Sequence, residues 1–287
     1  MFGTLLMLLE LEKLGTIERL VQNIQPQVST GNPELLLSLA HAHHAAGYIV
    51  SEGTRANESY LSIRHYEQME SIARTLNDHT LLNIALTYIG DMYRRLGKIE
   101  KAISYLEAAR DTTPLADDAA RGNGIQLLGH AYLQQNDINK FERAMAEAEE
   151  LAFTFDPATS STRGHYSVGT VYEEYGRAYT KLGQINKAME YLDKADATLP
   201  KTKFWELLVK TARTLTIIQA GDIRSGVQLA IEAAGECRAT GNLRYLERIY
   251  CVQQYLEDMM RDLDKISRPL RETLDEGRTT ELEWRRM

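Results

Sequence analysis

Residues 81–114 read LLNIALTYIGDMYRRLGKIEKAISYLEAARDTTP, and residues 167–200 read SVGTVYEEYGRAYTKLGQINKAMEYLDKADATLP. At an offset of 86 residues, the two segments carry glycine, tyrosine, alanine, leucine and proline at matching places. The matched pairs are Gly90/Gly176, Tyr93/Tyr179, Gly97/Gly183, Ala102/Ala188, Leu106/Leu192, Ala109/Ala195 and Pro114/Pro200. Chance would not preserve so many special residues at one offset, so the chain contains an internal repeat.

Each copy of the repeat predicts two antiparallel helices joined by a tight turn. Gly90 and Gly176 are small enough to let the two helices of a hairpin approach closely. Gly97 and Gly183 stand where the first helix should end, a place that favours a left-handed cap. The proline at the end of each segment stops the second helix. Such a hairpin cannot bury its apolar faces alone, so it must stack on neighbours.

The order Gly, Tyr, Gly, Ala, Ala, Pro resembles the tetratricopeptide repeat (TPR) family. The resemblance implies an all-α fold, a right-handed α-solenoid of about seven antiparallel helical hairpins. We expect one repeat domain over residues 1–278 and a polar tail over 279–287. The strong repeats are 81–114 and 167–200, the weaker ones are 33–76, 122–153 and 204–239, and the capping helices are 4–24 and 242–276.

The weaker copies depart from the pattern at identifiable places. Asn136 replaces the turn glycine, and Phe141 stands where a small alanine is expected. Thr214 and Gly226 replace the packing glycine and its alanine partner in the copy over 204–239. Asn32-Pro33-Glu34 is typical of a helix start, and we expect this helix to reach about Gly47. Further expected segments are a helix over 57–76, a loop over 156–161 and a last helix pair over 242–260 and 262–276.

Composition agrees with a globular helical protein. The 287 residues are 44% hydrophobic and include only 6 prolines, and the net charge is -7. An acidic balance argues against direct nucleic-acid binding. The two cysteines, Cys237 and Cys251, cannot make a disulfide framework, which favours a reduced, cytoplasmic protein. The apolar run over 4–11 is too short to span a membrane and lacks a preceding Lys or Arg, so neither a membrane segment nor a signal peptide is predicted.

Several residues are of the kinds that carry metal or phosphate chemistry. His41 and His44 could share a helix face, with His65 as a third ligand, but zinc would need a further ligand and HExxH is absent. Asp117-Asp118 resembles part of the Asp-rich motif of helical terpene synthases, although the third acid is missing. We interpret these two residues as a helix cap and predict no metal site.

Other patterns are also better explained by the repeat. The stretch 122–124, Gly-Asn-Gly, is not followed by the Gly-Lys-Ser/Thr of a phosphate loop, so we take it as the entry to a repeat. The stripe of Tyr172, Tyr175 and Tyr179 occupies core positions of the repeat. The cysteines have no acid–base partner nearby, and we expect them to be buried and structural. We therefore predict no catalytic residue, no cofactor and no enzymatic activity.

The resemblance implies a ligand groove. In this family the first helix of each pair lines the concave side of the superhelix, and its ligand-facing positions carry over to three copies here. Because Asp91 stands where chaperone-binding TPR domains carry an Asn, it would repel a carboxylate, and we predict no chaperone-tail recognition. We expect an extended or helical peptide of mixed charge. The predicted groove residues are Thr87, Asp91, Arg94, Asn123, Gln126, His130, Glu173, Arg177 and Thr180.

The main hypothesis is a non-enzymatic scaffold that binds a protein or peptide. A narrower hypothesis is that the chain is the ligand-sensing part of a bacterial regulator. Segments 75–78 and 239–242 are similar to hairpin ends in bacterial TPR-containing transcription regulators, in which a separate domain binds DNA. The alternative is an all-helical enzyme or small-molecule-binding protein, with a metal at His41 and His44. A third hypothesis is a homodimer formed through the end caps or through the leading helix, which carries leucines at 5, 6, 8 and 9.

Overall fold

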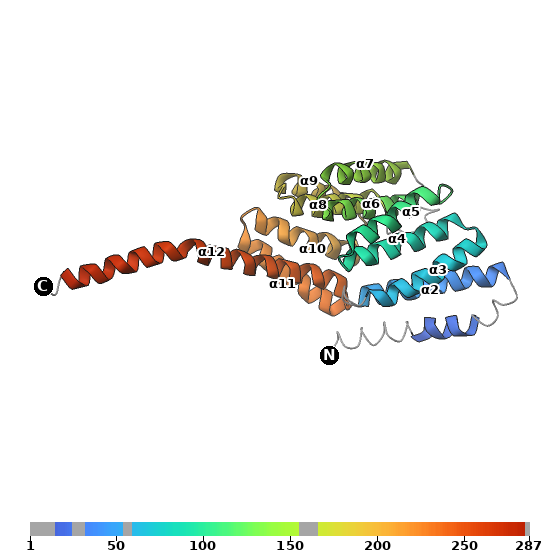
Figure 1. Ribbon diagram of the computed structural model, residues 1–287, viewed down its shortest axis with the longest axis horizontal. Coiled ribbons are helices and arrows are strands. Elements are labelled where there is room, and N and C mark those ends of the chain that lie inside the picture. Colours follow the sequence, from blue (N-terminus) through green and yellow to red (C-terminus); the bar gives the residue numbers. More distant parts are fainter. Residues whose placement is uncertain (1–14, 25–31, 54–58, 155–165, 285–287) are drawn as a thin grey trace.

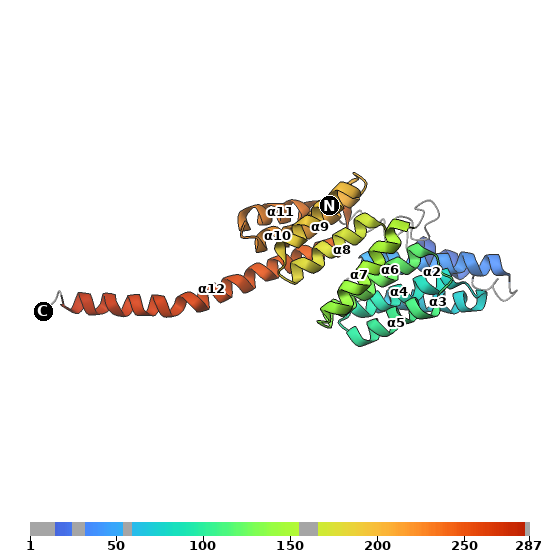
Figure 2. The same cartoon turned by 90° about the horizontal axis from the view of Figure 1, so that it is seen from above.

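The computed structural model describes residues 15–24, 32–53, 59–154 and 166–284, and this part of the chain is helical throughout, with no strand among its elements. Five antiparallel hairpins stack side by side into an α-solenoid, followed by one long helix that projects from the body (Figures 1 and 2). The hairpins are α2 (Pro33–Gly53) with α3 (Tyr60–Leu76), α4 (His79–Arg95) with α5 (Ile99–Thr112), α6 (Asp118–Gln134) with α7 (Ile138–Thr154), α8 (Val168–Lys181) with α9 (Ile185–Thr198), and α10 (Lys203–Gln219) with α11 (Ile223–Thr240); the long helix is α12 (Leu243–Trp284).

The all-α solenoid is confirmed, but its two ends differ from the prediction. The pair expected over 242–260 and 262–276 is one continuous helix, and α12 extends into the segment predicted as a polar tail. The residues around 261 include no Gly or Pro to end a helix, and Pro269 lies inside α12. The helix that starts at Pro33 continues to Gly53 instead of ending near Gly47. Residues 15–24 are helical, whereas 4–14 and the loop over 156–161 lie outside the described residues.

Side-chain caps set the helix starts that the sequence indicates. The backbone N–H of Glu34 donates to Oδ1 of Asn32 at 2.9 Å, directly ahead of α2. Asp117 accepts from the backbone N–H of Ala120 at 2.8 Å, which confirms its interpretation as a helix cap.

Left-handed residues set the turns within the hairpins. Gly97 has φ of +72° and Gly183 has φ of +70°, so the predicted glycine turns are confirmed. Asn136 takes the same place in the α6/α7 hairpin with φ of +65°. Asparagine tolerates this conformation better than most residues with a Cβ atom, so it can replace the turn glycine.

The two helices of each strong repeat touch at a glycine. A Cβ atom on Gly90 would lie 2.6 Å from Cγ of Leu106 and 3.2 Å from the carbonyl oxygen of Ala102. On Gly176 it would lie 2.6 Å from Cγ of Leu192. The 2.6 Å separations are shorter than a van der Waals contact, so an alanine at either position would force the leucine or the helices to shift.

The α10/α11 hairpin makes the same contact with the small residue moved to the other helix. A Cβ atom on Gly226 of α11 would lie 3.0 Å from the carbonyl oxygen of Thr214 on α10. The sequence replaces the usual glycine by Thr214 and the usual alanine by Gly226, so the exchange preserves close approach. Arg213 of α10 forms a 2.7 Å ion pair with Asp193 of α9.

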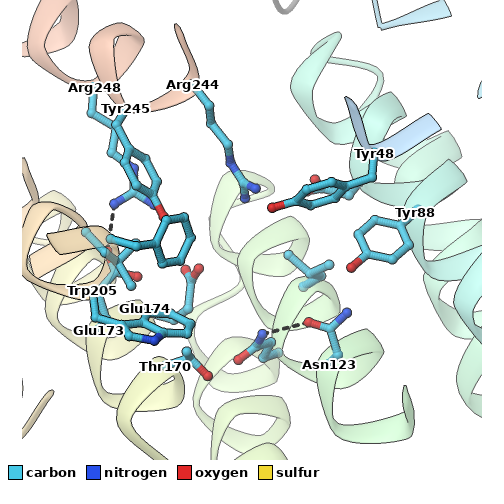
Figure 3. A pocket seen from close by; sticks show the side chains of 15 residues that line it. Tyr48, Tyr88, Asn123, Thr170, Glu173, Glu174, Trp205, Arg244, Tyr245 and Arg248 are labelled. Carbon is cyan, nitrogen blue, oxygen red and sulfur yellow. Dashed lines mark hydrogen bonds and ion pairs between the residues drawn. The ribbon is translucent and has the colours of Figure 1, made fainter. Parts of the chain in front are cut away.

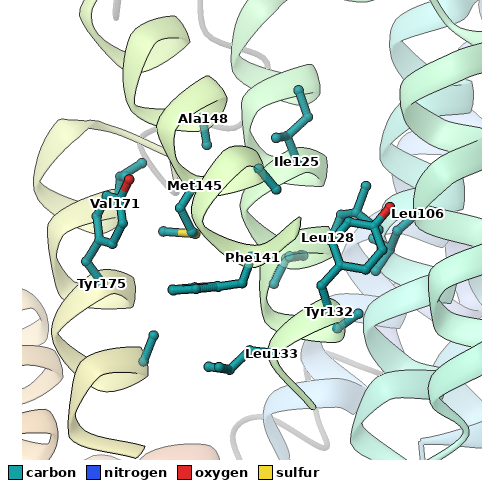
Figure 4. Close-up of a cluster of buried hydrophobic side chains, with 14 of the residues drawn as sticks. Leu106, Ile125, Leu128, Tyr132, Leu133, Phe141, Met145, Ala148, Val171 and Tyr175 are labelled. Atoms are coloured by element: carbon teal, nitrogen blue, oxygen red, sulfur yellow. The ribbon is translucent and has the colours of Figure 1, made fainter. Parts of the chain in front are cut away.

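Aromatic and aliphatic side chains fill the space between neighbouring hairpins. Phe141 and Met145 of α7 are fully buried and lie between α6 and α8 (Figure 4). The ring of Tyr175 stacks on that of Tyr191, with centroids 4.5 Å apart. Tyr93 and Tyr179 are buried as well, so the predicted core positions of the repeat are confirmed.

The glycine contact predicts a sharp difference between two Gly→Ala substitutions. Gly176→Ala forces a methyl group against Leu192 and should lower the free energy of unfolding by about 1–3 kcal/mol. Gly235→Ala, on the exposed face of α11 with no atom within 4 Å of its Cβ position, should raise it by about 0.5–1 kcal/mol through helix propensity. Urea denaturation followed by circular dichroism measures both, and a neutral Gly176→Ala would contradict the packing argument.

Candidate functional site on the inner wall

The first helices of successive hairpins face one another across the axis of the superhelix. Together with α12 they enclose a partly open cavity of about 80 Å³ (Figure 3). All six inner helices contribute to it. The lining includes Tyr48 of α2, Tyr88 and Asp91 of α4, Asn123 and Gln126 of α6, Thr170, Glu173 and Glu174 of α8, Phe204, Trp205 and Leu208 of α10, and Arg244, Tyr245 and Arg248 of α12.

The predicted groove residues lie on this wall, but the wall is more enclosed than a groove. The superhelix turns so far that α12 packs against α2. Asp91, Asn123, Gln126 and Glu173 line the cavity. The other five, Thr87, Arg94, His130, Arg177 and Thr180, lie on the same three helices but outside the cavity lining. Seven of the nine are at most 7% exposed, the exceptions being Arg94 and Arg177.

An ion pair joins α8 to α12, and a close contact between Glu174 and His130 joins α8 to α6. The carboxylate of Glu173 accepts from Nη1 of Arg248 at 2.8 Å and lies 3.0 Å from Nε of Arg177. Glu174 pairs with the same Arg177, and its Oε2 lies 2.5 Å from Nε2 of His130. Because Glu173 and Arg248 are 75 residues apart, this contact fixes the last helix to the middle of the solenoid.

Burial and neighbouring charges set the protonation of the network. Burial opposes ionisation of Glu174, but Arg177 and His130 hold its pKa well below the usual value. Burial lowers the pKa of His130 to about 4, so its imidazole is uncharged at neutral pH. Burial and the adjacent Arg177 lower the pKa of Arg248, because both guanidinium groups lie against the carboxylate of Glu173.

A separate ion pair lies on α4, at the edge of the same wall. Arg94 donates to Oδ1 of Asp91 from Nε at 2.9 Å and from Nη2 at 2.5 Å. Burial opposes the ionisation of Asp91, but Arg94, Arg244 and Arg95 hold its pKa below the usual value. Asp91 is therefore a carboxylate surrounded by cations, so it repels an anionic ligand less than the sequence alone suggests.

One buried acceptor in the cavity is left over. Nε2 of Gln126 donates to Oδ1 of Asn123 at 2.9 Å. Oε1 of the same Gln126 is buried and has no hydrogen-bond partner among the described residues. An unsatisfied buried acceptor costs about 1–3 kcal/mol, and a donor from a ligand or water would recover that energy. The aromatic rings of Tyr88 and Trp205 line the same cavity (Figure 3).

Sequence reasoning missed the contributions of α2, α10 and α12. Tyr48, Trp205 and Arg248 lie on helices whose repeat match is weak or missing, so no ligand-facing positions were carried over to them. Their place in the chain could have identified them, because each lies on the first helix of a hairpin or on the helix that follows the last hairpin.

The histidines of α2 face other directions than the sequence predicted. His43, not His41, faces His65, with 3.1 Å between the two Nδ1 atoms, and His41 is exposed. Burial and the neighbouring His65 lower the pKa of His43 to about 4. Among the described residues there is no group of three or more His, Cys, Asp or Glu side chains that could hold a metal ion.

The cysteines are divided in their exposure. Cys237 is buried, and burial raises the pKa of its thiol to about 11, in agreement with the predicted structural role. Cys251 is exposed on α12, so the expectation that it is buried is wrong. It lies on the outward side of a helix whose inward side contributes Arg248 and Val252 to the wall and core.

A stack of helical hairpins around a polar axis defines a TPR-like α-solenoid, and comparison with known proteins agrees. The tetratricopeptide repeat family model matches residues 80–109 and 169–197, so the two strong repeats are confirmed as TPR units. The crystal structure of BtubC (BKLC) from P. vanneervenii is similar, with a TM-score of 0.55, 15% identity, and coverage of 80% of this chain and 91% of that chain.

A second similar structure contains nearly identical TPR-like repeats from Podosopora anserina. It has a TM-score of 0.47 and 15% identity, and the match covers 72% of this chain and 97% of that one. No curated protein matches the sequence significantly. The family model supports the repeat and the BtubC structure supports the fold, and neither supports the resemblance to transcription regulators.

A search of the helices in the described part of the chain finds none that is both long and apolar enough to cross a bilayer.

Substitution of Glu173 tests how much the ion pairs of the inner wall contribute to stability. Glu173→Gln removes the carboxylate between Arg177 and Arg248, and we expect a loss of about 3–5 kcal/mol in the free energy of unfolding. Glu190→Gln breaks the exposed 2.7 Å pair with Lys194 and should cost less than about 1 kcal/mol. Urea denaturation at pH 7 compares the two variants, and equal losses would contradict the role of the network.

The buried His43 predicts loss of stability in mild acid. Its folded-state pKa of about 4 lies below the ordinary histidine pKa of 6.5, so the unfolded chain binds more protons between these values. Stability from this group is present above pH 6.5 and falls as the pH drops toward 4. We expect the loss between pH 8 and pH 5 to be smaller by about 2 kcal/mol in His43→Gln. The exposed control His41→Gln should keep the wild-type pH dependence in the same denaturation series.

Proposed function

We propose that this protein is a non-enzymatic TPR scaffold that binds a protein or peptide ligand at its inner wall. The observation that carries the proposal is the axial cavity, to which all six inner helices contribute side chains. It combines aromatic surface, fixed charges and an unsatisfied acceptor, which is the composition of a specific binding site. The proposal agrees with the TPR match over 80–109 and 169–197.

The size of the cavity defines how a ligand would bind. A volume of about 80 Å³ accommodates one side chain or a few waters, and not a folded segment. The ligand backbone therefore lies at the mouth, and one polar side chain enters to donate to Oε1 of Gln126. The rings of Tyr88 and Trp205 line the same cavity and supply apolar surface for the aliphatic part of that side chain.

The charges around the cavity favour a peptide of mixed charge. Carboxylates and guanidinium groups lie side by side on the wall, as in the pairs Arg94–Asp91, Arg177–Glu173 and Arg248–Glu173. A ligand that carries only one sign of charge would lie next to side chains of the same sign as well as next to those of opposite sign. No feature of the cavity favours the ligand-sensing part of a regulator or an all-helical enzyme, so these two hypotheses stay predictions.

Isosteric replacement of Gln126 tests the site. Peptides would first be selected against the wild-type protein from a random phage-displayed library. Gln126→Met keeps the side-chain length but removes the acceptor, together with the donor to Asn123, so affinity for a selected peptide should fall about 10-fold or more by isothermal titration calorimetry. Gln228→Met, on the exposed face of α11, makes the same chemical change away from the cavity and should leave affinity unchanged.

Two results would contradict the proposal: no peptide enriched over an unrelated helical control protein, or selected peptides that bind Gln126→Met and wild type equally. Substitution of Arg94 and Arg177 is a poorer test. Arg177 holds both Glu173 and Glu174, so its loss would disturb the wall itself.

A further inference from the structure

The lining of the axial cavity limits which ligand side chain can enter it. Gln126 is 4% exposed, and its Oε1 is a buried acceptor with no hydrogen-bond partner among the described residues. Only a ligand group that carries an N–H or O–H donor can satisfy this acceptor. A carboxylate has no such donor, so an anionic side chain would leave Oε1 of Gln126 unsatisfied.

A cationic side chain has donors, but the wall offers it no carboxylate without a partner. Each carboxylate that lines the cavity already has a guanidinium partner, in the pairs Asp91–Arg94, Glu173–Arg248 and Glu174–Arg177. Glu173 also lies 3.0 Å from Arg177, and Arg244 lines the same cavity. Burial and Arg177 already lower the pKa of Arg248, so positive charge is crowded at this wall. A ligand ammonium or guanidinium group would add a further buried cation, which is costly without a partner.

A neutral carboxamide meets both requirements. Its N–H group can donate to Oε1 of Gln126, and its carbonyl oxygen can accept from a guanidinium group. Figure 3 shows Arg244 and Arg248 across the cavity from Asn123, the hydrogen-bond partner of Gln126 on α6. A carboxamide carries its donor and its acceptor on separate atoms, whereas a hydroxyl group carries both on one atom and fills less of the cavity of about 80 Å³.

We propose that the axial cavity takes the carboxamide of a Gln or Asn side chain, an assignment that rests on the peptide binding proposed above. The amide nitrogen donates to Oε1 of Gln126, and the carbonyl oxygen faces the guanidinium groups of α12. Tyr88 and Trp205 supply apolar surface for the stem of the side chain. The mixed charge of the ligand belongs to the residues that flank the inserted one.

Small fragments test this chemistry without a peptide. Trp284→Phe leaves Trp205 as the one tryptophan of the chain, so the fluorescence of this full-length variant reports on the cavity. Propionamide should bind with a dissociation constant of about 1–10 mM, as expected for so small a fragment. Propionate, propylammonium and propanol, which share its short apolar chain, should bind at least about 10-fold more weakly at the same ionic strength.

Two further arms identify the source of the amide and the place where it binds. N-methylacetamide, an isomer of propionamide that resembles the peptide backbone, should bind more weakly because its methyl group replaces one N–H. Gln126→Met should weaken the binding of propionamide about 10-fold or more, whereas Gln228→Met, on the exposed face of α11, should leave it unchanged. Circular dichroism verifies that each variant is folded.

Two results with the fragments would overturn the assignment. One is a response to any of the other four fragments as strong as the response to propionamide. The other is no response to propionamide up to about 100 mM. Both comparisons use an unaltered wall, so they decide the question even where Gln126→Met fails to fold.

The selected peptides separate this assignment from the scaffold function. They should share a Gln or Asn whose replacement by Glu or Lys lowers the affinity about 10-fold or more. Peptides that depend on Gln126 but share no such residue would overturn the carboxamide assignment and leave the scaffold function standing. The absence of any enriched peptide would instead contradict the scaffold function itself.

Discussion

The whole architecture depends on the distance between two helix backbones within a hairpin. At Gly90 and Gly176 the second helix approaches so closely that a single methyl group would overlap a leucine. In a solenoid each hairpin contacts mainly its neighbours, so a geometry set inside one repeat is passed to the next and accumulates as curvature. The exchange of Thr214 and Gly226 shows that the constraint acts on the contact itself, because either helix can supply the small residue. The accumulated curvature brings α12 against α2 and converts a concave face into an enclosed cavity.

Enclosure explains why the inner wall is organised by ion pairs. Polar side chains that would be solvated in an open groove are buried here, and a buried charge is tolerated only with a partner. Glu173 and Glu174 therefore share Arg177, with Arg248 and His130 completing the set. The lowered pKa of Arg248 shows that burial and Arg177 together outweigh its attraction to Glu173. These pairs fix the side chains of the wall before any ligand binds, so a ligand that supplies a donor to Gln126 would enter a preorganised site.

The sequence predicts the local features well because local residues determine them. The turns at Gly97, Gly183 and Asn136 and the cap at Asp117 each follow from one residue type in one place. The cavity could not be predicted in the same way, since it depends on curvature accumulated over five hairpins and on contacts such as Glu173 with Arg248, 75 residues apart. The histidines show the intermediate case. Their helix was predicted, but which of them faces α3 depends on helix phase, and His43 rather than His41 takes that position.

The helix α12 departs furthest from the repeat pattern, because it packs on the last hairpin but forms no hairpin of its own. A repeat array normally ends in a helix with a polar outer face, because no further hairpin covers it. The first turns of α12 meet this requirement by joining the inner wall through Arg248 and burying Val252. The rest of the helix does the opposite, since it carries apolar side chains into solvent at heptad spacing while its charges pair along its own length. The packing of the solenoid therefore explains the first turns of α12, which Arg248 and Val252 fix to the body, and does not explain the exposed apolar residues beyond Leu256.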